Sequence, residues 1–287
     1  MKQSMNRWAA ITGWLCFLFA AGLFFLQMGF LLLYRRFGME YIDNRLFFIV
    51  NILCVFFFAL SIIFLLKRMV MIKWIISGIS VLFIIVNSVL FVQSNREIKN
   101  LISLSPDWEH MLVIKERVKT GEAIYYRSYY GILARPREKM PDQVSGPLKV
   151  QWLANDIAAV TYRTENHQLQ QFIGTYGDRG GGTSYYYVGA EIHGRWRAGH
   201  TEVVSSTKGI SVSENRATET FSWDDVEQFG TLAVVLKRNN EAVWTLSLNE
   251  NFKVRSNAAA PTVGNIRLFK ASMMKNQPLT LNYISEK

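Results

Sequence analysis

The segment with the most distinctive chemistry runs from Tyr176 to Tyr187 and reads YGDRGGGTSYYY. Gly177 and Gly182 have the spacing of a phosphate-binding loop, in which backbone N–H groups and a helix N-terminus surround a phosphate. That chemistry requires a lysine and then Ser or Thr after the last glycine, whereas Thr183 stands in the lysine position and tyrosines follow. Because glycines tolerate positive φ angles, the segment is predicted to be a long hairpin tip rather than a nucleotide site.

The same segment has a second chemistry, the capture of a polar ligand by loop side chains beside aromatic rings. Asp178 and Arg179 precede the tyrosine run, and loops on a rigid scaffold commonly carry binding residues. Consecutive residues of a strand point to opposite faces, so the tyrosines at 185–187 cannot all face a core. Rings at a surface can stack on sugars or peptides. We therefore predict ligand contacts from Asp178, Arg179, Tyr185 and Tyr187.

The sequence lacks the usual signatures of catalysis and metal binding. It contains neither G-x-S-x-G nor H-E-x-x-H, and the adjacent Asp224 and Asp225 would diverge rather than converge on a substrate. Glu191 and His193 would share one face of a strand, with His200 across a turn. Isolated histidines are more often hydrogen-bonded or exposed than metal ligands. The sequence thus predicts a protein without enzymatic activity, cofactor or bound metal.

Three long apolar runs precede the candidate binding residues and indicate that the chain is attached to a membrane. Residues 8–33, 46–66 and 74–92 contain no ionised side chain, and the shortest run has 19 residues. About 20 apolar residues in a helix cross the hydrocarbon core of a bilayer, so the runs predict three transmembrane helices. The first run exceeds the apolar part of a signal peptide and predicts an uncleaved anchor. Cys16 and Cys54 both lie in the spans, so no disulfide is expected after them.

The charge distribution limits the classes of partner. Residues 1–92 hold eight Lys/Arg and two Asp/Glu, and residues 93–287 hold 24 and 20, so the excess positive charge is mainly juxtamembrane. Such cations contact lipid head groups, and the second part lacks the clustered basic face that nucleic acid requires. The spans hold no acid, histidine or arginine, which disfavours a transport path. Asn51 and Asn87 are predicted to hydrogen-bond between helices.

The cations that flank the spans bear on the orientation in the membrane. They divide equally between the two sides: Lys2, Arg7, Lys67, Arg68 and Lys73 on one, and Arg35, Arg36, Arg45, Arg96 and Lys99 on the other. The tendency of Lys/Arg-rich loops to remain in the cytoplasm therefore does not determine the orientation of the chain in the membrane. The α-amino group adds charge to the first side, and Glu40 and Asp43 lie on the second. These asymmetries favour a multi-pass cell-membrane protein with a cytoplasmic N-terminus and an extracytoplasmic C-terminal domain.

After the third span the hydrophobic period changes from helical to alternating. Residues 93–107 form a polar connector, in which Ile98, Leu101 and Ile102 recur three to four apart and predict that the helix continues. Residues 108–287 contain short apolar–polar alternations separated by turns, as in an antiparallel sandwich, barrel or meander. The predicted fold is a membrane protein with three N-terminal transmembrane helices followed by a mainly antiparallel β domain.

Several elements of the β domain can be placed individually. Alternation on both sides of a turn predicts hairpins over residues 111–130 and 148–163. The tyrosine-rich residues 184–190 are predicted to form a strand. Residues 223–229 (WDDVEQF) are the best helical candidate, because Ser222 and the two aspartates suit a helix N-terminus.

One segment resembles a known family. Residues 209–226 (GISVSENRATETFSWDDV) resemble the strand–turn–strand run ending in W-[DE]-D-[IV] of bacterial PH-like membrane-associated domains. The resemblance covers less than a tenth of the chain. It implies seven strands and a helix, and a domain that faces the cytoplasm, opposite to the side favoured by the flanking charges.

Two functional hypotheses follow. The first is a membrane-anchored, non-enzymatic binding or sensing protein of a bacterial cell envelope, whose extracytoplasmic β domain binds a polar ligand or partner. The alternative is a structural subunit of a membrane complex with a cytoplasmic PH-like β domain, whose spans contact another membrane protein or a second copy of the chain. Both place the chain in a lipid bilayer, and neither involves nucleic acid.

Overall fold

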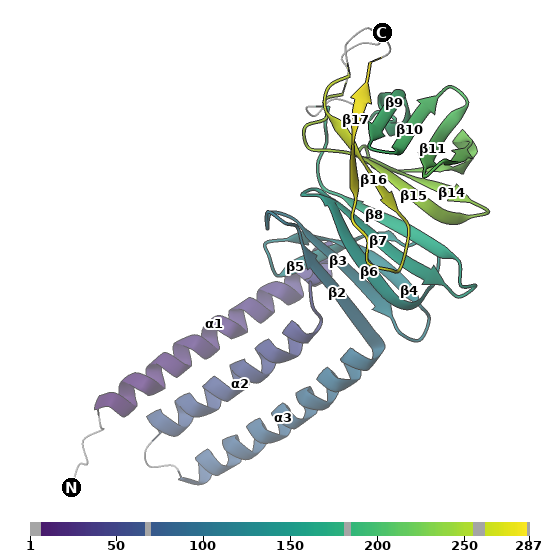
Figure 1. The fold of residues 1–287 in the computed structure, drawn as a ribbon. Helices are drawn as coiled ribbons and strands as arrows, with labels where there is room; N and C mark the ends of the chain where they lie inside the picture. The colour runs from purple at the N-terminus through teal and green to yellow at the C-terminus, as the bar shows by residue number, and fades with distance from the viewer. Residues whose placement is uncertain (1–6, 67–69, 181–184, 255–261, 286–287) are drawn as a thin grey trace. The chain divides into compact units, whose positions relative to one another are not determined.

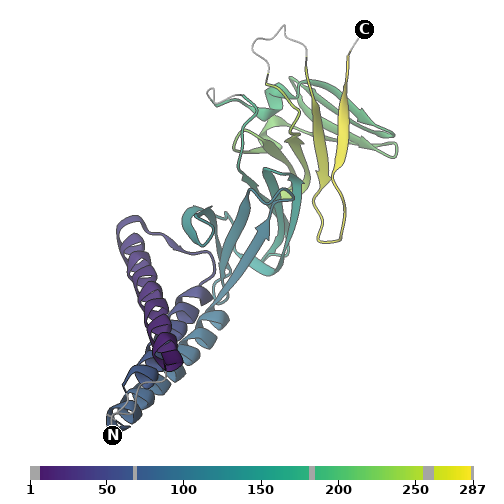
Figure 2. The ribbon, with the colours of Figure 1, turned by 90° about the vertical axis from the view of Figure 1, so that its left-hand side faces the viewer.

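The computed structural model describes residues 7–66, 70–180, 185–254 and 262–285 and is drawn from two sides in Figures 1 and 2. The chain divides into two compact units. The first comprises residues 1–100, 113–120 and 126–138, and the second comprises residues 101–112, 121–125 and 139–287. Two segments of β structure therefore belong to the same unit as the helices.

Three long helices dominate the first unit: α1 (Arg7–Phe37), α2 (Arg45–Leu65) and α3 (Val70–Glu97). All three are long and apolar enough to span a membrane, which confirms the predicted membrane part. Only 6 to 17% of the residues in their apolar windows are buried within the protein, so most of these side chains are left for lipid to cover. α1 and α3 both pack on α2, which is therefore the central helix.

The third helix continues beyond the predicted span, as expected, but only to Glu97 and not through Ile98, Leu101 and Ile102. α3 ends at Glu97, and the next seven residues form strand β2 (Ile98–Leu104), which pairs with β3 (Met111–Arg117). At the boundary, Val118 N donates a hydrogen bond to Glu97 O at 2.9 Å. The backbone of β2 thus finds its partners on the next strand of the chain, after the loop of residues 105–110. The local spacing of apolar residues carries no signal of that pairing.

The connection between α1 and α2 is part of a β-sheet. Its strand β1 (Glu40–Tyr41) lies at the edge of a five-stranded sheet with the order β1-β5-β4-β3-β2. The two remaining strands of that sheet are β4 (Glu122–Tyr129) and β5 (Leu133–Lys139). β1 pairs with β5 in antiparallel register, and Ile42 N donates to Ile132 O at 3.0 Å. The ends of two membrane helices are therefore fixed to the sheet.

A buried lysine strengthens this attachment. The ammonium group of Lys115 donates to Glu40 Oε2 at 2.7 Å, Tyr41 O at 2.8 Å and Asn44 Oδ1 at 2.6 Å. Its side chain is 5% exposed, and Nζ lies 4.7 Å from the centroid of the Tyr126 ring. Burial lowers the pKa of Lys115, against the opposing effect of its bond to Glu40. We refer to these five residues as the Lys115 clasp.

The second unit contains two further antiparallel sheets. The smaller sheet comprises β6 (Val144–Ala154), β7 (Ile157–Thr164) and β8 (Leu169–Thr175). The strands of the larger sheet are β9 (Gly194–Ala198), β10 (Thr201–Ser206), β11 (Gly209–Glu214), β12 (Ala217–Phe221), β13 (Val226–Phe229), β14 (Ala233–Arg238), β15 (Glu241–Leu248), β16 (Asn265–Lys270) and β17 (Leu279–Ile284). Its order is β12-β11-β10-β9-β17-β16-β15-β14-β13, with antiparallel neighbours throughout.

The larger sheet builds the main core of the second unit. Its buried side chains form one hydrophobic cluster that includes Trp196, Leu236 and Trp244. β8 packs against β13, β14 and β15, where the rings of Phe172 and Phe229 meet edge to face at 5.7 Å. The mainly antiparallel β structure confirms the predicted fold class, and the hairpins predicted over residues 111–130 and 148–163 are present as β3–β4 and β6–β7.

Two predicted elements are replaced by others. The strand predicted over residues 184–190 is wrong, because its described part ends in the single helical turn α4 (Val188–Glu191). Val188 and Ile192 are both fully buried, and helical spacing brings both into the core. Of the helix predicted over residues 223–229, only a 3₁₀ turn, η1 (Trp223–Asp225), forms before β13.

The order of elements also departs from that implied by the PH-like resemblance. The resembling residues 209–226 form β11, β12 and η1. They belong to a sheet of nine strands rather than seven, and no helix follows β17 in the described chain, which extends to residue 285. The short motif therefore does not bring the PH-like fold with it.

The two asparagines of the spans provide a test of the helix arrangement. Asn51 Nδ2 approaches Asn87 Oδ1 at 3.5 Å, and Asn87 Nδ2 donates to Phe83 O at 3.0 Å. Because Asn87 is 6% exposed, an Asn87→Leu substitution should reduce the free energy of unfolding by about 0.5–1.5 kcal/mol. Denaturation of the full chain in mixed detergent micelles measures this. Ser88→Leu, on the exposed face of α3, is the control and should have less effect.

Candidate functional site

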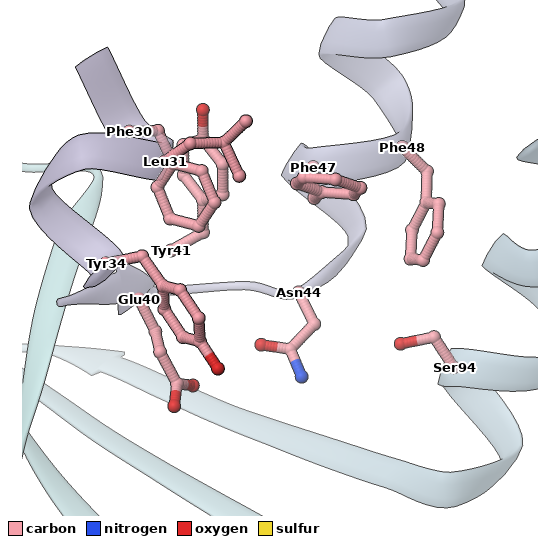
Figure 3. A pocket seen from close by; sticks show the side chains of 9 residues that line it. All are labelled: Phe30, Leu31, Tyr34, Glu40, Tyr41, Asn44, Phe47, Phe48 and Ser94. Atoms are coloured by element: carbon pink, nitrogen blue, oxygen red, sulfur yellow. The ribbon is translucent and has the colours of Figure 1, made fainter. Parts of the chain in front are cut away.

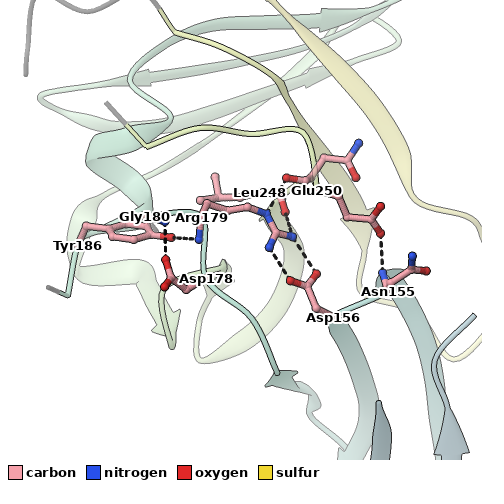
Figure 4. Close-up of polar contacts among 9 residues, drawn as sticks. Asn155, Asp156, Asp178, Arg179, Gly180, Tyr186, Leu248 and Glu250 are labelled. Carbon is pink, nitrogen blue, oxygen red and sulfur yellow. Dashed lines mark hydrogen bonds and ion pairs between the residues drawn. The ribbon is translucent and has the colours of Figure 1, made fainter. Parts of the chain in front are cut away.

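Arg179 is the centre of a polar network that follows β8 (Figure 4). Its guanidinium group forms a two-point ion pair with Asp156, with Nη1–Oδ2 at 2.5 Å and Nη2–Oδ1 at 2.8 Å. Arg179 Nε also donates to Asn249 O at 2.8 Å, and Nη2 donates to Leu248 O at 3.3 Å. Only 7% of the arginine side chain and 12% of the aspartate side chain are exposed. The network joins the β6–β7 turn to the end of β15.

This geometry corrects the prediction that Arg179 is displayed to a ligand. A guanidinium group carries five N–H donors in a planar fork, and here the fork is directed at one carboxylate and two backbone carbonyls. Asp178, which was predicted to bind a ligand together with Arg179, accepts a hydrogen bond from Gly180 N within its own loop. Gly177 permits the close approach, because a Cβ atom there would lie 2.3 Å from Asp156 Oδ2.

The tyrosine run beyond this network divides between inward and outward positions. Tyr186 turns inward, and its hydroxyl oxygen accepts a hydrogen bond from Arg179 N at 2.9 Å. Tyr185 and Tyr187 are 63% and 69% exposed, and their rings meet edge to face at 5.7 Å. Their role in ligand binding stays a prediction. Residues 181–184, which include two of the four glycines of the glycine-rich tip, lie outside the described residues.

Tyr187 lines an apolar pocket with residues from α4, η1, β13 and β14. The pocket has a volume of about 410 Å³, and its lining residues are Tyr187, Gly189, Ala190, Trp223, Val226, Gln228 and Val234. Trp223 forms one wall, with its ring against Gly189, where a Cβ atom would lie 2.4 Å from the ring. Its indole Nε1 donates to Thr207 O at 3.1 Å. The ring is thus held in place while 39% of the residue remains exposed.

Gln228 is the polar residue of the pocket, and its amide is already engaged. Its Oε1 accepts from Val188 N at 3.0 Å. Its Nε2 lies within 2.8–3.0 Å of three acceptors, which are Tyr185 Oη, Tyr186 O and Gly230 O. These bonds fix the segment that carries the tyrosines to β13. The remaining pocket surface is mostly ring and aliphatic carbon, which suits an apolar side chain better than a charged ligand.

The strand that would have brought Glu191 and His193 together as metal ligands does not form. Glu191 and His193 were expected on one face of a strand, but Glu191 ends the helical turn α4 and β9 begins only at Gly194. In the part of the chain that the structure describes, no three His, Cys, Asp or Glu residues gather as a metal site would require.

Two pocket residues were not identified as site residues from the sequence. Trp223 was assigned to a helix start, and Gln228 to the same helix, so neither was linked to the tyrosine run. Val188 and Gln228 are 40 positions apart, and only the fold brings them together. The one local signal in the sequence was the run of tyrosines at 185–187, which cannot all face a core.

Together the fold and the pocket define a membrane-anchored β protein with an aromatic-lined apolar cavity in its second unit. Comparisons of the chain with protein-family models, curated proteins and solved structures find no match.

The Asp156–Arg179 pair allows a stability test. Asp156→Asn should leave the guanidinium group buried without its countercharge and destabilise the protein by about 3–5 kcal/mol. Glu202→Gln is the matched control, because Glu202 pairs with Arg195 and Arg197, whose side chains are 44% and 48% exposed. Its effect should stay below about 1 kcal/mol. Chemical unfolding of the full chain in detergent, followed by near-ultraviolet circular dichroism, compares the two. Equal effects would show that the buried pair has no special role.

Proposed function

We propose that this chain is a membrane-anchored, non-enzymatic binding protein of a cell envelope, whose second unit captures a protein partner through the pocket at Tyr187 and Trp223. The observation that supports this most directly is the exposure of two aromatic rings around an apolar cavity of about 410 Å³. Exposed aromatic residues around a preformed pocket are typical of protein interfaces, where they act as anchoring points.

The expected occupant is an apolar side chain of an extended partner segment. The amide of Gln228 already makes four hydrogen bonds within the protein. A sugar or charged ligand would therefore find few free donors or acceptors in the pocket, whereas an aromatic or aliphatic side chain would bury apolar surface against Trp223 and Val226. Arg179 supports this site indirectly, because its N–H bond to Tyr186 orders the tyrosine segment before a partner arrives.

The proposed orientation places the second unit outside the cytoplasm. Ion pairs compensate two of the five cations on its side of the membrane: Arg45 pairs with Asp43, and Lys99 pairs with Glu116 at 3.6 Å. The five cations of the N-terminal side have no acidic neighbour within residues 1–7 or 67–73. Cations without acids next to them in the sequence are attracted to the anionic cytoplasmic leaflet, so we assign the N-terminal side to the cytoplasm.

The alternative of a structural subunit receives less support. Asn51 and Asn87 are polar side chains of the spans that a membrane partner could contact, and they approach each other within one chain, as the sequence predicts. The hypothesis stays a prediction.

A combined Tyr185→Ala and Tyr187→Ala variant tests the binding proposal. Both rings are mostly exposed, so the melting temperature should stay nearly unchanged, as for other surface substitutions. Peptides selected from a displayed library on the full chain in nanodiscs should carry an aromatic or aliphatic anchor and bind the variant at least about tenfold more weakly. Surface plasmon resonance measures the affinities.

The control for this variant is Tyr130→Ala, which removes an 87% exposed ring outside the pocket. It should leave peptide affinity unchanged. A large fall in the melting temperature of the double variant would mark the two rings as structural. Selected peptides that bind both variants as well as the original chain would contradict the proposed pocket.

A cysteine at an exposed turn tests the orientation. Lys208→Cys lies in the turn between β10 and β11, while Cys16 and Cys54 lie in the helices. A membrane-impermeant maleimide should label this variant in intact cells, and the unsubstituted chain measures the background. Protection of the Lys208→Cys variant from labelling until the cells are lysed would place the second unit in the cytoplasm.

A further inference from the structure

A second pocket lies in the first unit, where the end of α1, strand β1, the start of α2 and the end of α3 meet (Figure 3). Its volume is about 420 Å³, and the lining residues are Phe30, Leu31, Tyr34, Glu40, Tyr41, Asn44, Phe47, Phe48 and Ser94. These residues come from the last turns of α1, the β1 connection, the first turn of α2 and the last turn of α3. All three helix ends belong to candidate membrane spans, so the pocket lies at the surface level of the bilayer.

The lining divides into an apolar part and a polar rim. Phe30, Leu31, Phe47 and Phe48 contribute rings and aliphatic carbon from α1 and α2. The rim carries the hydroxyl groups of Tyr34 and Ser94, the amide of Asn44 and the carboxylate of Glu40. This combination of apolar floor and polar edge corresponds to the boundary between acyl chains and head groups of a lipid.

Gln27 adds a donor on the same side of α1. Residues 27, 30, 31 and 34 are spaced three and four apart, so Gln27 shares a helix face with three lining residues, deeper in the span. It is 6% exposed, and its Oε1 accepts from Tyr41 Oη at 3.1 Å. Among the residues that the structure describes, its Nε2 has no hydrogen-bond partner. A buried amide donor without a partner is costly, although Gln27 is not itself one of the residues that line the pocket.

We propose that this pocket binds one phospholipid with a primary-ammonium head group, of the phosphatidylethanolamine type. The ammonium group meets the Glu40 carboxylate, and the phosphate lies toward the hydroxyl groups of Tyr34 and Ser94. The first part of an acyl chain covers Phe30, Leu31, Phe47 and Phe48. This inference is independent of the partner pocket in the second unit.

The charge of the lining favours this head group over an anionic one. Among the nine described lining residues, Glu40 alone carries a charge, and it is negative. Lys115 donates to its Oε2 from within the protein, and Tyr126 Oη donates to Oε1 at a longer 3.3 Å. The pair of Glu40 and Lys115 is neutral overall, which suits a zwitterionic lipid. An anionic head group would instead meet a carboxylate without a countercharge on the pocket side.

Native mass spectrometry of the purified full chain tests the proposal. The chain is titrated in detergent with phosphatidylethanolamine or phosphatidylglycerol of the same acyl chains. A first bound lipid should appear with about tenfold higher affinity for phosphatidylethanolamine, because the ammonium–carboxylate bond is charge-assisted. Equal affinity, or a preference for phosphatidylglycerol, would overturn the head-group assignment.

Pocket-filling variants locate the site. Ser94→Phe places a ring in the pocket from α3 and should reduce the affinity for the first phosphatidylethanolamine at least about tenfold. Ser88→Phe is the matched control, since it makes the same change on the same helix at an exposed position outside the lining. Loss of lipid in neither variant, or equal loss in both, would overturn the location.

A second variant protects the test against misfolding. Leu31→Trp fills the same pocket from α1, at a residue that is 40% exposed and outside the Lys115 clasp. Circular dichroism and size-exclusion chromatography establish that each variant is folded. If Ser94→Phe does not fold, Leu31→Trp gives the answer alone: retained affinity for phosphatidylethanolamine in a folded Leu31→Trp chain would contradict the site.

Discussion

Lys115 places an ammonium group in a protein interior, and the first unit depends on how that charge is satisfied. A buried amine is stable only when its donors are all used, and here they meet a carboxylate, a backbone carbonyl and an amide oxygen, with an aromatic ring beside them. All three acceptors belong to the short connection between α1 and α2, more than 70 residues earlier in the chain. Removing any of them would leave the cation short of a partner.

This constraint sets the arrangement of the helix ends. Apolar helices gain little from the hydrophobic effect when they associate in lipid, because lipid tails are as apolar as their side chains. Polar contacts and close packing at the ends then carry more of the specificity. With the connection held by Lys115 and paired to β5, Tyr41 stacks on Phe30 at 4.0 Å and reaches Gln27. The pocket of about 420 Å³ between the helix ends is a consequence of this arrangement.

The second unit uses a buried charge in the same way. Arg179 lies in irregular chain after β8, and its ion pair with Asp156 fixes that segment against the end of β15. The segment in turn holds Tyr186 inward through its backbone, which leaves Tyr185 and Tyr187 at the surface. Arg179, which the sequence suggested as a ligand contact, is therefore a buried structural residue that holds this segment in place. The apolar pocket lined by Tyr187 and Trp223 is the better candidate for binding.

The sequence by itself determined the three membrane helices, because a bilayer imposes a length and an absence of charge that can be read residue by residue. It also determined the β3–β4 and β6–β7 hairpins, whose strands are neighbours in the chain. Only the tertiary structure decided the strand at residues 98–104, the helical turn at 188–191 and the partners of Lys115 and Arg179. Those outcomes depend on strand pairing, core packing and charge compensation, and the acceptors of the Arg179 and Lys115 side chains lie 23 or more positions away in the chain, where local patterns carry no record of them.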